Sequence, residues 1–347
     1  IFTDVDGDLV SVSTSKGSLT AANFVLIPTG LGAQLATMAL ESNSAFQGTD
    51  IEITVERAAG GNGQVNVGYI DATGIDLGHV HVEGDLAQID AGDSITPQRG
   101  LLGLHAQSLG KLGLATQLPE GTLQSDIQGA LKKLRIENDV TNAALFVTGD
   151  VRSIVIGGDL FGGSIRSGGQ LGAIHISGDV TASDSSPAII SAAGTLAPAN
   201  NGQALAIAGI HIGGSVRGAE ILAGYDISAL PVNPDVRIGK VRVRGDWIGS
   251  SMVTGADAGE DGLFGTADDS LIAESNSIVA RIASILIRGV AAATDSEFDH
   301  YGIVGEQITS LTVNALKVPL KPGASDEPQP LPIDGADDFS VLEVFAR

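Results

Sequence analysis

Short segments in which aliphatic and polar residues alternate recur along the middle of the chain. Residues 154–160 read Ile-Val-Ile-Gly-Gly-Asp-Leu, and 20 residues later residues 174–180 read Ile-His-Ile-Ser-Gly-Asp-Val. Alternation with a period of two predicts a strand with one buried face, and the Gly-Asp pair predicts a turn after it. Each copy therefore predicts a short strand that ends at a corner.

The same pattern can be traced through most of the chain. Leading strands are expected to begin at Val80, Leu112, Leu134, Ile154, Ile174, Ile210, Val241, Ile285 and Leu311. Strands this short gain stability by stacking on their counterparts in neighbouring repeats, as in solenoids. Because parallel crossovers are nearly always right-handed, the predicted fold is all-β, a right-handed parallel β-helix (β-solenoid) of imperfect rungs. Loop insertions are expected at residues 93–110, 181–209, 225–239, 256–284 and 291–302.

The two ends of the chain depart from the repeat. Residues 1–61 contain alternating strands without the Gly-Asp corner, which predicts an N-terminal β cap or small β domain. Residues 62–316 form the predicted solenoid. Residues 317–347 begin with a Pro-rich linker and end in a terminal strand at residues 339–345. That strand is expected either to fold back as a cap or to pair with the edge of a neighbouring molecule.

The composition of the chain disfavours some classes of binding partner and excludes some kinds of site. Asp and Glu number 41 against 19 Lys and Arg, a net charge of −22, which disfavours nucleic acid and anionic membrane surfaces. No apolar run is long enough to span a membrane, so direct insertion is not expected. The chain has no Cys, which excludes disulfides and thiolate sites. We expect an exported segment, extracellular or at the cell surface, that is stabilised by another means such as calcium.

One acidic, glycine-rich loop matches much of a twelve-residue calcium loop. Asp257 takes position 1, Asp261 position 5 and Asp268 position 12, with the required glycine at position 6. Position 3 is a glycine without a side-chain oxygen, and position 12 is Asp instead of Glu. Calcium ligands are predicted at Asp257, Asp261, Asp268 and Asp269, with a backbone carbonyl from Leu263. The loop resembles the acidic calcium loops of many secreted bacterial proteins.

A second acidic motif lies near the start of the chain. Asp4, Asp6 and Asp8 alternate around a glycine, which places three carboxylates on one side of a turn and predicts further calcium ligands. An Asp-Gly hairpin turn is the alternative interpretation. The motif resembles the openings of cadherin-like bacterial surface repeats. A third acidic cluster, Asp334, Asp337 and Asp338, is less specific.

Histidines occupy one repeated position. His81, His175 and His211 each lie between two inward aliphatic residues, and Arg135 and Arg242 take this position in other copies. All should face outward from one sheet. An exposed polar ladder is predicted, and a transition-metal site is the alternative.

The repeat and acidic motifs together resemble secreted bacterial right-handed parallel β-helix surface proteins. That resemblance implies a structural or adhesive role, as a surface layer, sheath, filament or adhesin stalk, with partners among copies of itself, other surface proteins or glycans. The alternative is a carbohydrate-binding or carbohydrate-cleaving β-helix protein. Aromatic residues make up only 4% of the chain, Trp247 falls at a core position, and no hydrolase motif is present. We therefore expect no enzymatic activity and assign no catalytic residue.

Overall fold

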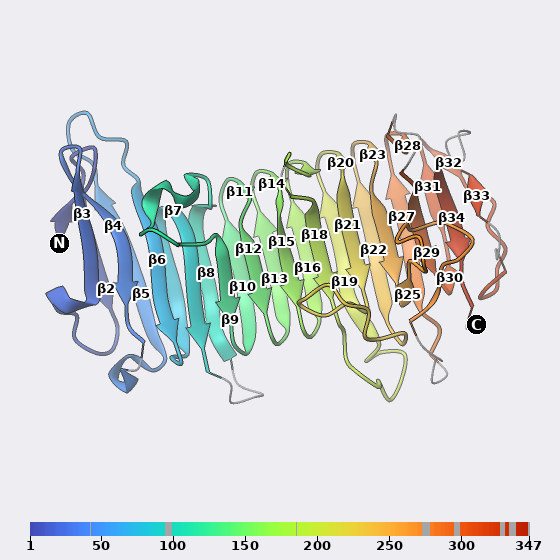
Figure 1. Cartoon of the computed structure of the whole chain (residues 1–347), viewed down its shortest axis with the longest axis horizontal. Coiled ribbons are helices and arrows are strands. Elements are labelled where there is room, and N and C mark those ends of the chain that lie inside the picture. The colour runs from blue at the N-terminus through green and yellow to red at the C-terminus, as the bar shows by residue number, and fades with distance from the viewer. Residues whose placement is uncertain are drawn as a thin grey trace. The chain divides into compact units, whose positions relative to one another are not determined.

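The computed structural model describes residues 1–41, 43–93, 99–184, 186–272, 278–294, 299–326, 330–332 and 338–345. Within these ranges the regular structure is nearly all β-strand, with short 3₁₀ turns at Ala21–Asn23, Ser44–Phe46 and Gly113–Thr116. It forms two compact units, Ile1–Asp159 and Leu160–Arg347. In each unit, strands far apart in sequence lie side by side in a mostly parallel sheet (Figure 1), an arrangement consistent with a β-solenoid.

The strands of the first unit are longest at residues 77–92 and 99–109. They are β1 (Phe2–Thr3), β2 (Leu9–Thr14), β3 (Phe24–Thr29), β4 (Gly32–Ala39), β5 (Thr49–Glu56), β6 (Val65–Thr73), β7 (Leu77–Gly92), β8 (Arg99–Leu109), β9 (Gln124–Ile127), β10 (Ala130–Ile136), β11 (Val140–Thr141), β12 (Ala144–Val147) and β13 (Val151–Ile156).

Aliphatic side chains of the first unit stack in columns, as the alternation predicts. One column runs through parallel strands in the order Ile51, Val80, Leu104, Leu134 and Ile154. Each of these side chains is at most 1% exposed. Parallel pairing that aligns these positions, despite register shifts elsewhere in the ladders, turns the alternation of a single strand into one continuous core.

The N-terminal segment begins with antiparallel hairpins and then joins the parallel stack. β2 pairs antiparallel with β1 and β5, and β3 pairs antiparallel with β4. β4 and β5 then pair parallel with β6 and β7. The parallel stack therefore includes strands that precede residue 61. The expected domain boundaries after residues 61 and 316 stay predictions.

The second unit repeats a long strand, a two-residue strand and a short strand in that order. We call each such set of three strands, with the turns that join them, a coil. The strands of the second unit are β14 (Leu160–Phe161), β15 (Gly163–Ser167), β16 (Leu171–Ile176), β17 (Val180–Thr181), β18 (Ala188–Ala192), β19 (Leu205–Ile212), β20 (Val216–Arg217), β21 (Ala219–Ala223), β22 (Arg237–Val243), β23 (Trp247–Ile248), β24 (Ser251–Thr254), β25 (Ala256–Asp257), β26 (Ser270–Leu271), β27 (Arg281–Ile287), β28 (Ala291–Ala292), β29 (Tyr301–Gly305), β30 (Gln307–Ile308), β31 (Leu311–Val313), β32 (Leu316–Lys317), β33 (Leu331–Pro332) and β34 (Phe339–Glu343).

Three buried columns run through the second unit. The long strands align Ile174, Ile210, Val241, Ile285 and Leu311. The two-residue strands align Leu160, Val180, Val216, Trp247 and Ala291. The short strands align Ile165, Ile190, Ile221, Met252, Ile303 and Val341. The Trp247 ring is fully buried and its Nε1–H donates to the Ser250 carbonyl, so the core position expected for this residue is confirmed.

The Gly-Asp corners join each coil to the next. The Asp179 carboxylate accepts a hydrogen bond from the backbone N–H of Ser215 at 2.6 Å, and Asp246 accepts one from Val290 at 3.1 Å. A Cβ on Gly214 would overlap the Asp179 carboxylate, and a Cβ on Gly289 would overlap that of Asp246. The glycine is needed because the carboxylate of the preceding coil occupies the space beside it.

Three details of the expected repeat are wrong. The predicted insertion at residues 181–209 contains β18, which pairs with β15 and β21, and the start of β19. The predicted insertion at residues 93–110 contains β8, which pairs with β7 and β10. Leu112 does not begin a strand; it is exposed and lies next to a 3₁₀ turn. The sequence Leu104-His105-Ala106 lacks the Gly-Asp corner, so the pattern missed this coil and assigned the next aliphatic run instead.

At the C-terminal end, the last strand folds back on its own chain. β34 pairs parallel with β29, and β33 pairs antiparallel with β34. Glu343 at its end is fully buried, with one carboxylate oxygen accepting from the Ile308 N–H and the other from the Asp326 N–H. This corresponds to the fold-back alternative for the terminal strand.

Candidate functional site

The turn between β1 and β2 gathers three carboxylates. Asp4, Asp6 and Asp8 each place one carboxylate oxygen within 4.8 Å of the others. Gly7 makes this possible, because its φ of +100° lets the chain reverse between them. One oxygen of Asp4 accepts the backbone N–H groups of Asp6, Gly7 and Asp8 at 2.9 to 3.2 Å. The turn is thus built around the Asp4 side chain.

The same carboxylates also bind the loop that follows β5. Asp8 accepts the N–H groups of Ala58 and Gly63, both at 2.6 Å, and Asp6 accepts that of Asn62 at 3.0 Å. These contacts join residues 50 to 56 positions apart in the sequence. The acidic turn therefore holds the start of the chain against the first coil of the parallel stack.

Two carboxylate oxygens of this turn are buried without a partner. They are Oδ2 of Asp4 and Oδ1 of Asp6, and Asp4 as a whole is only 3% exposed. Burial, and then the proximity of the Asp6 carboxylate, raise the pKa of Asp4 to about 6. Oxygens that ligate one calcium ion at 2.3 to 2.6 Å must lie within about 5 Å of one another, as these do. The donor set fits a calcium ion, which would satisfy both oxygens.

The acidic loop at residues 257–269 is closed by its own backbone. One oxygen of Asp268 accepts the N–H groups of Glu260 and Asp261, and the other accepts the Thr266 hydroxyl. These hydrogen bonds, that from Thr266 first, lower the pKa of Asp268 to about 2. Asp261 accepts the N–H of Leu263, so its carboxylate also serves the loop.

This loop is also anchored to the sheet beneath it. Apolar side chains on the outer face of β18, β21, β24, β29 and β34 pack under the loop, and their cluster comprises Ile189, Leu222, Tyr225, Val253, Ala256, Leu271, Ala280, Val304, Leu342 and Val344, with Phe264 and Ile272 against it. Asp269 is buried here and accepts the Gly265 N–H at 2.7 Å. Burial raises the pKa of Asp269 to about 7. We call residues 256–272 the strap.

The two predicted calcium sites thus differ in geometry. Within the described part of the chain, Asp4, Asp6 and Asp8 form the only group of three acidic or histidine side chains with ligand atoms this close. The structure does not bring Asp257, Asp261, Asp268 and Asp269 together in that way, and the Leu263 carbonyl instead lies 3.4 Å from the Thr266 hydroxyl. The strap ligands stay a prediction. Asp334 and Asp337 lie outside the described residues.

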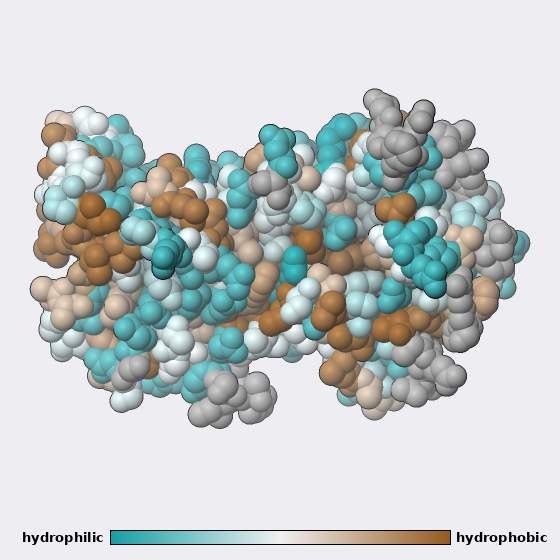
Figure 2. Space-filling model, viewed as in Figure 1, coloured by the Kyte–Doolittle hydropathy of each residue, from teal (hydrophilic) through white to brown (hydrophobic). Residues whose placement is uncertain are grey.

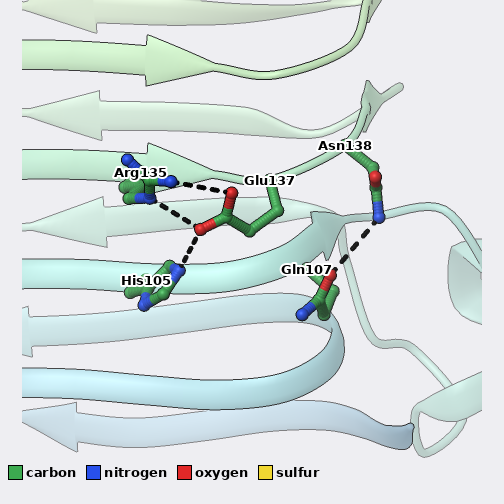
Figure 3. A network of polar contacts seen from close by, with 5 residues as sticks. All are labelled: His105, Gln107, Arg135, Glu137 and Asn138. Carbon is green, nitrogen blue, oxygen red and sulfur yellow. Dashed lines mark hydrogen bonds and ion pairs between the residues drawn. The ribbon is translucent and has the colours of Figure 1, made fainter.

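The repeated histidines face outward and stack within each unit. The rings of His81 and His105 are 4.6 Å apart, and those of His175 and His211 are 5.0 Å apart. His105, which the pattern missed with β8, also lies 2.6 Å from Glu137, and Glu137 accepts two hydrogen bonds from the Arg135 guanidinium (Figure 3). The expected polar ladder is present in both units, and in the first unit Glu137 neutralises it.

This network makes a testable pH prediction. The Arg135 guanidinium and then the His105 ring lower the pKa of Glu137 to about 2, so Arg135→Gln should raise it toward 4.5. A carboxyl whose pKa is lowered by folding stabilises the protein above about pH 4.5 and loses that effect as the pH falls toward 2. Because the side chain is partly exposed, the effect on stability should stay below about 1 kcal/mol. NMR titration of the Glu137 carboxyl checks this, with Lys133→Gln on the same strand as a control that should leave the midpoint unchanged.

A cavity of about 240 Å³ lies in the second unit between the strap and the sheet. Glu220 lines it together with Phe264, His300 and Tyr301. Gly218 and Gly249 also line the cavity and have no side chains to fill it. Burial raises the pKa of Glu220. The sequence pattern gave no signal for this cavity, because its residues come together only through the strap and the loop before β29.

No helix among the described residues is both long and apolar enough to cross a membrane. The resemblances to calcium loops, cadherin-like repeats and bacterial surface β-helices rest on the short motifs given above. Compared as a whole, the chain matches no protein-family model, no curated protein and no solved structure.

Proposed function

We propose that the protein is an extracellular structural or adhesive protein of the cell surface, stabilised by calcium at Asp4, Asp6 and Asp8. The observation that carries this proposal is the pair of buried, unpartnered carboxylate oxygens in the acidic turn. A cation there would join the first hairpin to the loop after β5. Extracellular calcium modules bind at roughly 10⁻⁴ to 10⁻³ M, which suits a small site of three carboxylates in a calcium-rich surrounding.

We also propose that the coils wind in the right-handed sense and that the first hairpins cap the stack. The handedness follows from the general preference of parallel crossovers. The cap is supported by the pairing, because β1, β2 and β3 are joined only by antiparallel ladders, whereas β4 to β8 all take part in parallel ladders.

Self-association is supported by the edge of this cap. Among the described strands β3 pairs with β4 alone, and Val25, Leu26 and Ile27 are exposed on it. Figure 2 shows hydrophobic surface over this part of the molecule. An exposed apolar edge strand is a template for strand addition, so a second copy of the chain is the proposed partner.

The assembly proposal is tested by sedimentation and electron microscopy with and without calcium. The full chain should form oligomers in calcium, and Ile27→Lys should be monomeric because a charge on the edge strand opposes strand addition. Phe161→Lys, at an exposed apolar position of the second unit, is the matched control and should still assemble. A wild-type chain that stays monomeric at high concentration with calcium would rule out self-association.

A second candidate function is carbohydrate binding or cleavage. The cavity beside Glu220 favours it, because a buried carboxyl with a raised pKa beside aromatic rings is an arrangement that sugars fit. A glycan array combined with a reducing-sugar assay separates the two candidates. Sugar release that is lost in Glu220→Gln would favour the enzyme.

A further inference from the structure

One face of the second unit is basic although the chain is strongly acidic. The long strands β16, β19, β22, β27 and β31 stack in order and contain no Asp or Glu. Cationic residues gather on β22 and β27 and directly after them, and they are Arg237, Lys240, Arg242, Arg244, Arg281 and Arg288. In a chain with a net charge of −22, this concentration of positive charge is specific to one place.

The cations surround a pocket of about 330 Å³. It is lined by His211, Arg242, Val243, Arg244, Leu286 and Arg288. Arg242 lies between His211 and Leu286 of the adjacent strands. Arg244 and Arg288 each follow one member of the Val243 and Ile287 pair, so they leave adjacent strands at the same level. Burial, His175 and these arginines lower the pKa of His211.

In the first unit, the arginine at the corresponding position of the repeat has its charge neutralised by a carboxylate. Arg135 and Arg242 occupy the same place in the repeat, and the residue two positions after Arg135 is Glu137, which pairs with it (Figure 3). Two positions after Arg242 the chain has Arg244, and the corresponding residue of the next coil is Arg288. Where the first unit supplies a counterion, the second supplies two more guanidinium groups.

These guanidinium groups lack a counterion in the described part of the protein. Arg217 pairs with Asp246 nearby, but no described carboxylate forms an ion pair with Arg242, Arg244 or Arg288. Like charges on adjacent strands destabilise a sheet. Ion pairing within the described fold therefore does not account for the cluster, and its exposed guanidinium groups are accessible to an anionic ligand.

We propose that this pocket binds an acidic saccharide through its carboxylate or sulfate group. Guanidinium groups bind such oxyanions with two parallel hydrogen bonds, and the pocket is large enough for about one sugar unit. The half-buried Leu286 side chain offers an apolar surface to the sugar ring. The net charge of the chain repels densely charged polymers such as nucleic acids, so a glycan with spaced charges fits better. This names a partner chemistry for the adhesive role proposed above, on which it rests.

Titration calorimetry of the full chain with a galacturonate tetrasaccharide tests the proposal. Wild type should bind it, and binding should weaken as salt is added. Arg242→Gln combined with Arg288→Gln should weaken binding at least about tenfold, since each removes charge-assisted hydrogen bonds. Arg217→Gln, an exposed arginine outside the pocket, is the matched control and should bind as wild type does. Unchanged melting temperatures would show that each variant is folded.

Titrations with other ligands test which chemical group the pocket recognises. A neutral galactose tetrasaccharide should not bind, and inorganic sulfate or phosphate should bind more weakly than the acidic saccharide. Equal binding of the neutral sugar, equal binding of the free ions, or no binding of the acidic saccharide would each overturn the proposal. Calcium binding is measured on Asp6 variants and saccharide binding on arginine variants, so either proposal can fail while the other holds.

Discussion

Ile176→Asp will destabilise the second unit by about 3–5 kcal/mol, because it leaves an unpaired charge in the core. Ile176 is fully buried and stacks on Ile212 of the next coil. His175→Asp, one residue earlier on the opposite face, should change stability by no more than about 0.5 kcal/mol. His175 is exposed and touches its neighbour His211 only through ring stacking. Urea unfolding of both variants measures the difference.

A matched control separates the effect of charge from that of lost volume. Ile176→Val removes one methyl group from the same column and should cost only about 0.5–1.5 kcal/mol. If the two Asp variants were equally destabilised, the assigned register of β16 would be incorrect.

Calcium will raise the melting temperature of the wild-type chain, and Asp6→Asn will abolish this rise. At a hundredfold excess over the dissociation constant, binding to the folded state alone contributes about 2.7 kcal/mol. In chelator, Asp6→Asn should be at least as stable as wild type, because it removes a negative charge beside the buried Asp4 carboxylate. Calorimetric scans with calcium and with chelator give both values.

Asp261→Asn in the strap is the control for the location of the site. If the acidic turn binds the ion, this variant keeps the calcium-dependent rise. Loss of the rise in Asp261→Asn but not in Asp6→Asn would place the ion in the strap. A wild-type melting temperature that calcium does not change would remove calcium from the proposed function.

The register of the coils could be predicted from sequence because it depends on local alternation. Ile174 and Ile176 show by their spacing alone that they share a face, and Asp179 marks the corner after them. β8 could not be found in this way, since its corner is made differently. Asp85 there accepts hydrogen bonds from the Ser108 hydroxyl and the N–H groups of Lys111 and Leu112. Ser108 lies opposite Asp85 and follows Gln107, so the corner after β8 has no Gly-Asp pair to mark it.

The candidate sites also differ in how far they could be predicted, because some depend on residues adjacent in sequence and others on contacts between distant residues. Asp4, Asp6 and Asp8 are adjacent in sequence, so their meeting follows from one turn. The strap resembles a calcium loop in sequence, yet whether Asp268 faces an ion or the loop backbone depends on its hydrogen bonds. The basic pocket was hidden by the net charge, which averages over the chain. Arg244 and Arg288 are 44 positions apart and become neighbours only through the pairing of β22 with β27.

The corner contacts have a consequence for how such a chain can change in length. Asp179 accepts a hydrogen bond from Ser215 in the next coil, the Ser215 hydroxyl accepts one from Asp246 in the coil after that, and Asp246 accepts one from Val290 in the following coil. A coil in this series therefore accepts a corner hydrogen bond from the coil after it and donates one to the coil before it, whatever the number of residues in its loops. Gain or loss of a complete coil conserves every corner, whereas insertion of one residue within a long strand turns its aliphatic side chains outward. Duplication of the gene segment that encodes one or more whole coils would thus lengthen the protein while extending the existing core.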